Sequence, residues 1–140
     1  MIDVDDIRQL VVAGHAAPWD GEAGLNQQRL GVENACDLAR RFASSGIEVV
    51  IADVLTRRTA ELYRARLSDV MIVQLRISLT EARRRAAQRS VYLTDDEFEL
   101  LHRQQPSDAR LYDDVVDVDG LDLAGQVASV RRIWSGQAER

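Results

Sequence analysis

The 140-residue sequence contains no lysine, because all 18 of its basic residues are arginine. This absence excludes chemistry that needs a lysine side chain, namely Schiff bases, lysine general bases and the phosphate-binding lysine of a P-loop. Codon bias in a GC-rich genome is a simpler explanation for the surface positions. The missing lysine gains meaning only beside features that point to a reaction requiring one.

Cysteine, proline and long apolar runs are also scarce. The single cysteine, Cys36, cannot form an internal disulfide, so we expect a reducing cytoplasm and a buried thiol. No apolar run approaches the roughly 18 residues that a membrane span requires. A net charge of −5 argues against nucleic acid and anionic membranes as partners. These limits favour one cytoplasmic domain that is long enough to bury a core.

Strand patterns alternate with helical patterns along the chain. Apolar, β-branched runs predict strands at 47–55, 70–77 and 115–118. Helical periodicity and capping pairs predict helices at 25–45, 57–67, 79–89 and 95–105, and a last one that Asp122 caps. The first four residues suit either a strand end or a helix start, and 13–24 is typical of a loop. This order predicts an α/β fold with a mainly parallel sheet.

Two helices carry apolar stripes that we expect to be buried. The stripes are Ala35, Leu38, Ala39 and Phe42 in one helix, and Leu123, Val127, Val130 and Trp134 in the last one. Gly46 lies where a helix ends in a left-handed residue.

Polar residues lie at or near the carboxyl ends of the predicted strands. Ligands of open α/β sheets bind at the carboxyl ends of the strands. The residues at these ends are Asp5, Asp6, Asp53, Arg76, Asp119 and Gly120. Acids and an arginine at one sheet edge suit a site for phosphate and a divalent cation.

Each of these candidates also has a structural interpretation. Asp53 either holds a Mg²⁺-bound water or caps the loop that follows its strand. Asp5 and Asp6, with Arg8, either place a general base beside a hydroxyl or cap a helix over 5–12. The arginines at 83–85 and 89 either bind phosphate or form a solvated face paired with acids at 95–99.

Several segments, taken in order, resemble small P-loop kinases. They are IDVDDIR at 2–8, GHAAPWDGEAGL at 14–25, the run from NQQRL to ADVL at 26–55, MIVQLRISLTEARRRAAQR at 71–89, DDEFELLH at 95–102 and YDDVVDVDGLDL at 112–123. The likeness is strongest to bacterial AAA-type ATP-binding proteins grouped with chloramphenicol-phosphotransferase-like and gluconate- or shikimate-kinase-like enzymes. The resemblance covers nearly the whole chain and implies a three-layer parallel sheet with helices on both faces.

The resemblance implies catalytic and metal roles for three residues. Asp5 matches the acid that contacts or activates the acceptor hydroxyl, and Arg8 matches a substrate-binding arginine. Asp53 matches the Walker-B-like position that organises Mg²⁺.

The resemblance also implies four nucleotide-binding residues. Arg85 and Arg89 match lid arginines that contact phosphates. Asp119 and Gly120 match the loop after the last strand, which lies near the adenine.

One part of the P-loop kinase pattern is missing from these residues. The first strand, the glycine-rich loop with its lysine, and the following helix form a unit of roughly 30 residues that has no counterpart here. The missing strand is the central one and would lie between 47–54 and 70–77. We therefore expect a single P-loop-kinase-like domain over 1–140 that is incomplete at its N-terminus and lacks the central strand.

The expected function is ATP-dependent phosphotransfer to a small-molecule hydroxyl, without activity in this 140-residue form. The expected partners are a nucleotide and a small acceptor, and ATP and Mg²⁺ are expected only if the missing P-loop is supplied. One alternative is a non-catalytic binding or dimerisation module derived from such a kinase, which would allow a homodimer. The other is an unrelated α/β binding domain with a coincidental likeness.

Overall fold

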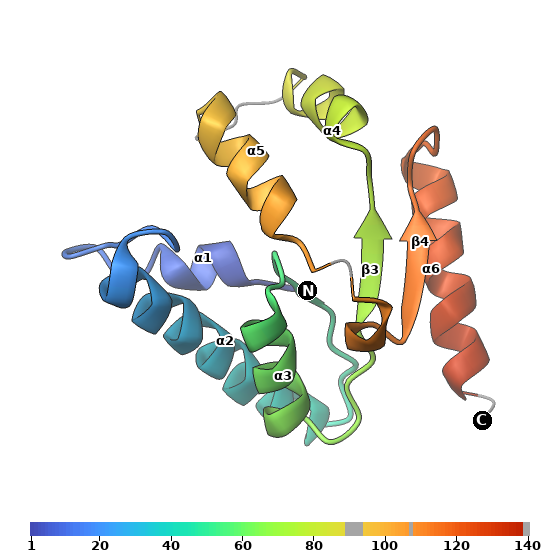
Figure 1. Ribbon diagram of the computed structural model, residues 1–140. Coiled ribbons are helices and arrows are strands. Elements are labelled where there is room, and N and C mark those ends of the chain that lie inside the picture. Colours follow the sequence, from blue (N-terminus) through green and yellow to red (C-terminus); the bar gives the residue numbers. More distant parts are fainter. Residues whose placement is uncertain (89–93, 107, 139–140) are drawn as a thin grey trace. The chain divides into compact units, whose positions relative to one another are not determined.

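The computed structural model describes residues 1–88, 94–106 and 108–138. These residues form a mixed α/β structure with six α-helices and two small parallel sheets of two strands each. Internal contacts divide the chain into a first unit, Met1–Val70, and a second unit, Met71–Arg140 (Figure 1). The α/β class and the parallel strand direction are thus confirmed.

The first unit is built around one long helix. Its elements are β1 (Ile2–Asp3), α1 (Val4–Arg8), α2 (Gly21–Ala43), β2 (Ile51–Ala52) and α3 (Arg57–Arg66). The two strands pair in parallel, and both α1 and α3 pack against α2. The side chains of Val4, Val32 and Cys36 are fully buried, which confirms the prediction for the cysteine.

The second unit contains the longer strand pair. Its elements are β3 (Val73–Arg76), α4 (Leu79–Ala86), α5 (Asp95–Gln104), a 3₁₀ turn (Ala109–Leu111), β4 (Asp114–Asp117) and α6 (Leu123–Ala138). Four residues of β3 pair with four of β4, and α6 lies beside β4 (Figure 1). The core of this unit contains Ile72, Leu111, Val116 and Val118.

The strand predicted at 47–55 is much shorter in the structure. Only Ile51–Ala52 pairs as a strand, and its partner β1 also has two residues. A strand ladder extends only as far as its partner, and beyond the paired residues the Val50 carbonyl oxygen accepts the Ile2 N–H at 2.8 Å. The side chains of Ile47 and Val50 are about half exposed. The other two strands occupy 73–76 and 114–117, close to the predicted 70–77 and 115–118.

The predicted loop at 13–24 was wrong at its end, because α2 begins at Gly21. Gly24 belongs to the helix, and a Cβ there would lie 1.9 Å from the carbonyl oxygen of Ala17. The glycine thus permits a close approach of the preceding loop and does not mark a turn. Residues 1–4 include both a strand and the first residue of a helix.

The capping signals located the helix starts well. Ser78 caps α4, and Thr94 with Glu97 forms a complete capping box at the start of α5. Asp122 accepts a hydrogen bond from the backbone of the first turn of α6. Gly46 has a φ of 76°, as expected for the left-handed residue after a helix.

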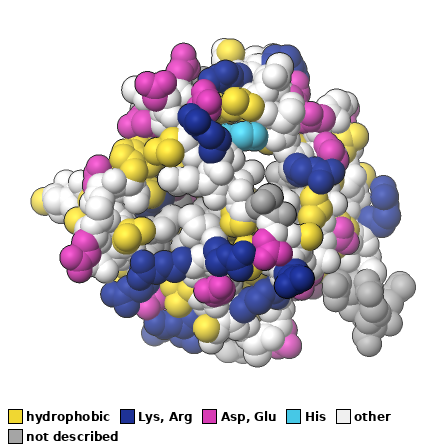
Figure 2. Space-filling model, in the orientation of Figure 1, with side chains coloured by type: hydrophobic (Ala, Val, Ile, Leu, Met, Phe, Trp, Pro, Cys, Tyr) yellow, Lys and Arg dark blue, Asp and Glu magenta, His cyan; other side chains and the backbone are white. Residues whose placement is uncertain are grey.

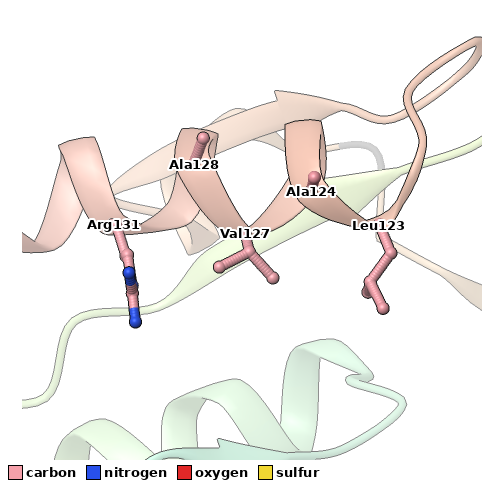
Figure 3. A pocket seen from close by; sticks show the side chains of 5 residues that line it. All are labelled: Leu123, Ala124, Val127, Ala128 and Arg131. Atoms are coloured by element: carbon pink, nitrogen blue, oxygen red, sulfur yellow. The ribbon is translucent and has the colours of Figure 1, made fainter.

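Both predicted apolar stripes are buried only in part. In α6, Leu123 is 76% exposed and Val127 is 43% exposed, and Figure 3 shows both side chains projecting from one side of the helix. In α2, Leu38 and Phe42 are exposed, whereas the small residues Ala35 and Ala39 of the same stripe are buried.

Candidate functional site

Three predicted residues come together in the first unit. β1 and β2 are parallel, so the residues after both strands lie at the same edge. Asp5 and Arg8 belong to α1, and Arg8 Nη1 lies 3.1 Å from Asp5 Oδ1. Both residues interact electrostatically with Asp53, which follows β2. We call Asp5, Arg8 and Asp53 the strand-end cluster.

Asp53 is the most perturbed carboxyl of this cluster. Burial raises its pKa to about 6, against the lowering effect of hydrogen bonds from Tyr63 and the Val54 backbone N–H. A carboxyl group with a pKa this close to neutrality can both accept and release a proton at physiological pH. The raised pKa therefore suits Asp53 to general-base chemistry.

Tyr63 is a site residue that sequence reasoning missed. It lies on α3, is 3% exposed, and donates a hydrogen bond from its hydroxyl to Asp53 Oδ2 at 3.0 Å. Burial, with the nearby Asp53, raises the pKa of the phenol, so the hydroxyl stays protonated. The available signal was a tyrosine on the inward face of the helix after Asp53, because a buried tyrosine hydroxyl needs a partner.

Arg8 is held against α2 at the position of Gly31. A Cβ at Gly31 would lie 2.9 Å from Arg8 Cγ, so the glycine leaves space for the arginine stem. The Arg8 side chain is 14% exposed, and its buried Nε has no hydrogen-bond partner among the described residues. The guanidinium thus keeps a polar N–H group that no described residue satisfies.

The helix predicted at 5–12 is α1, Val4–Arg8, and its cap is an earlier residue. Asp3 Oδ1 accepts the Asp5 N–H at 3.0 Å, so Asp5 and Asp6 lie in the first turn and do not cap it. The Asp5 side chain is 66% exposed. It is therefore accessible to a ligand, and its only side-chain bond in the described structure is to Arg8.

Three predicted nucleotide-binding residues come together in the second unit. Asp119 Oδ1 accepts the Ser78 N–H at 2.9 Å, which ties the loop after β4 to the start of α4. Arg85 Nη2 donates to the carbonyl oxygens of Val118 and Leu121, on either side of Asp119 and Gly120. Arg85, Asp119 and Gly120 therefore lie at the carboxyl end of β4.

The arginines of α4 are bound mainly by the protein's own acceptors. Arg85 Nε donates to Glu81 at 2.7 Å, and Arg84 also pairs with Glu81. Hydrogen bonds from these two arginines lower the pKa of Glu81 to about 2. Arg83 pairs with Glu99 at 2.9 Å, as the interpretation of a solvated, ion-paired face predicts. Figure 2 shows basic and acidic side chains interspersed on the visible face.

These contacts do not make a cradle for nucleotide phosphates. Three of the five N–H donors of Arg85 are bound by Glu81 and two backbone carbonyls. The sequence offers no lysine, and Arg89 lies outside the described residues. The described residues also contain no group of three or more acidic, histidine or cysteine side chains that could hold a metal ion. The metal role of Asp53 remains a prediction.

Comparison with known proteins does not assign the chain to a family. No model of a known protein family matches the chain, and no curated protein matches it. The resemblance to P-loop kinases therefore remains a prediction. Within the described residues, no helix has both the length and the apolar character needed to cross a membrane.

Proposed function

We propose that this chain is a phosphotransferase-type domain related to small P-loop kinases, and that the strand-end cluster is its site for a hydroxyl acceptor. The observation that carries the proposal is the convergence of Asp5, Arg8 and Asp53 after two parallel strands. The resemblance to P-loop kinases implies acceptor roles for Asp5 and Arg8 and a Mg²⁺ role for Asp53. Polar residues at this edge of a parallel sheet are where ligands of α/β folds bind.

The chemistry of the cluster divides between its members. Asp53, with a pKa of about 6, accepts the proton of the acceptor hydroxyl. The Arg8 guanidinium supplies a positive charge beside the oxygen that loses its proton. Asp5 is exposed, holds Arg8 by their ion pair and contacts the acceptor from the solvent side. This assignment gives Asp53 the role of base, because its carboxyl is the desolvated one.

The strand pairing supports the finer fold that the resemblance implies. Among the described residues each sheet has two strands, so each has edges at which a further strand could pair. The two sheets belong to different units, and the resemblance places a further strand between 47–54 and 70–77. We propose that such a strand completes a three-layer parallel sheet.

The proposal assigns the acceptor side of the reaction to this chain and the nucleotide side to a P-loop. The sequence has no lysine, and the described arginines of α4 are engaged by protein acceptors. ATP and Mg²⁺ would therefore bind productively only where a glycine-rich loop with its lysine is present. By themselves, these 140 residues transfer no phosphate.

The test compares this chain with a form that carries a strand, glycine-rich loop and helix of P-loop type ahead of Met1. Acceptor-dependent ADP formation is measured over a panel of small hydroxyl compounds. We expect ADP only from the P-loop-bearing form. In that form, Asp53→Asn should lower kcat by roughly 100-fold or more, the usual effect of losing a general base.

A matched control is available within the first unit. Asp69 is exposed and bonds to the neighbouring Ser68 hydroxyl, so Asp69→Asn removes a carboxylate away from the cluster. Its kcat should equal that of the unmodified form. An absence of acceptor-dependent ADP from the P-loop-bearing form would contradict the proposal, and so would equal effects of the two substitutions.

A second candidate function is a non-catalytic binding module of the same ancestry. It is favoured by one observation, the engagement of Arg85 by Glu81 and two carbonyl oxygens in a chain without lysine. Such a module would bind a small ligand at the strand-end cluster without nucleotide. Acceptor binding to the 140-residue chain, with no ADP formation from the P-loop-bearing form, would favour it.

A further inference from the structure

We infer that Tyr63 is a positioning residue of the strand-end cluster, an inference that rests on the proposed function. Its hydroxyl donates to Asp53 Oδ2 at 3.0 Å and joins α3 to the segment after β2. A carboxylate has about four lone-pair sites, so the bonds from Tyr63 and the Val54 N–H leave others for a bound hydroxyl. Tyr63 thus fixes the orientation of Asp53 without occupying all of its acceptor capacity.

Packing alone does not account for a tyrosine at this position. The side chain is 3% exposed, and phenylalanine would fill nearly the same volume without a hydroxyl to satisfy. A buried hydroxyl that loses its partner destabilises the folded state. Its partner here is the Asp53 carboxyl group, at 3.0 Å. The hydroxyl therefore acts on Asp53 and adds little to the core.

The donor is presented by a helix that is held at both ends. Thr56 and Thr59 form a capping box at the start of α3. Near the other end, Arg66 Nη2 lies 2.5 Å from Glu33 Oε1 on α2. Tyr63 lies between these two interactions, so its hydroxyl bonds to Asp53 from a helix whose position is fixed.

Arg8 is the group toward which Asp53 would turn without this bond. The two side chains interact electrostatically, and no ion pair joins them in the described structure. The buried Arg8 Nε has no hydrogen-bond partner among the described residues. Removing the Tyr63 hydroxyl would therefore leave Asp53 with a competing donor and more than one side-chain orientation.

The test measures the side-chain rotamer at position 53 in the 140-residue chain. Three-bond couplings between Hα and the two Hβ protons, obtained by NMR, report whether one rotamer or several are populated. Tyr112→Phe is the matched control, because it removes a tyrosine hydroxyl that donates to the Pro106 carbonyl in the second unit. We expect one rotamer in the wild type and in Tyr112→Phe, and averaged couplings in Tyr63→Phe.

Unchanged couplings at position 53 in a folded Tyr63→Phe variant would overturn the inference. If that variant does not fold, Asp53→Asn takes its place, because the amide oxygen still accepts from the tyrosine hydroxyl. The side chain at position 53 should then keep a single rotamer. Averaged couplings in Asp53→Asn would overturn the inference.

Activity separates this inference from the proposed function. In the P-loop-bearing form, Tyr63→Phe should lower kcat by roughly 10- to 100-fold and change the acceptor KM by less than about twofold, because a misplaced base slows the chemical step. Averaged couplings at position 53 in Tyr63→Phe, with no phosphotransfer by any form, would support the positioning role and contradict the proposed function. Phosphotransfer by the P-loop-bearing form, with unchanged couplings in Tyr63→Phe, would support the proposed function and contradict the positioning role.

Discussion

At the scale of single residues, the unusual titration of Asp53 has a consequence for stability. Its pKa in the folded chain is about 6, above the ordinary value of 3.8, because burial disfavours the charged form. A raised carboxyl pKa means that the folded state binds the proton more tightly than the unfolded state. The stability that the protonated Asp53 carboxyl contributes is present below pH 4 and is lost as the pH rises through 6.

Asp53→Asn should therefore become more stable relative to wild type as the pH rises from 4 to 7, by up to about 3 kcal/mol. Urea unfolding at a series of pH values measures the difference. Asp117→Asn is the opposing control, because a hydrogen bond from Arg76 lowers the pKa of Asp117. The stability that the Asp117 carboxylate contributes is present above pH 4 and is lost as the pH falls. The same pH trend in both variants would refute the assignment.

A second residue-scale prediction concerns two glycines within helices. Gly24→Ala would place a Cβ 1.9 Å from the Ala17 carbonyl oxygen, so α2 or the preceding loop must move. We expect a loss of about 1–3 kcal/mol, the usual cost of overpacking. Gly136→Ala in α6 meets no atom within 4 Å and should stabilise the chain by about 0.5–1 kcal/mol. Thermal or urea unfolding measures the stability of both variants. Equal changes in stability would contradict the close approach at Gly24.

At the scale of elements, α3 carries the positioning tyrosine and depends on its N-terminal cap. Thr56 accepts the Thr59 N–H, and the Thr59 side chain bonds back to the Thr56 backbone. Thr56→Ala should cost about 1 kcal/mol of stability, and Thr56→Ser should cost much less because the hydroxyl remains. Urea unfolding compares the two variants. If both lose the same stability, the cap is not what holds this helix end.

The elements also show which sequence signals were dependable. The capping pairs at Ser78 and Thr94 marked helix starts correctly, because a cap involves residues only three apart. The length of the strand predicted at 47–55 was wrong, because a ladder depends on a partner far away in the sequence. For the same reason the exposure of Leu123 and Val127 could not be read from the periodicity of α6.

At the scale of the whole molecule, the chain consists of two units. In each unit, polar residues lie at the carboxyl ends of the strands. The first unit holds the strand-end cluster, and the second holds Arg85 with Asp119 and Gly120. Burial raises the pKa of Asp53 in the first unit, whereas hydrogen bonds from two arginines lower the pKa of Glu81 in the second.

Nucleotide binding provides the prediction at this scale. Titration of the 140-residue chain with ATP and Mg²⁺ in a calorimeter should give no saturable heat, because the chain has no lysine and Arg85 is engaged by Glu81. A form with a P-loop unit ahead of Met1 should bind ATP. Micromolar affinity of the 140-residue chain for ATP would contradict this division of roles.

The sequence by itself determined the features that depend on composition and on neighbours along the chain. It showed that lysine chemistry is absent, that helices begin after their caps, and that Asp53 lies near the end of an apolar strand. Only the tertiary structure decided that these three residues share one neighbourhood, that Tyr63 donates to Asp53, and that Arg85 is bound by its own chain. Hydrogen bonds and desolvation depend on atoms brought together by folding, and spacing along the sequence does not encode them.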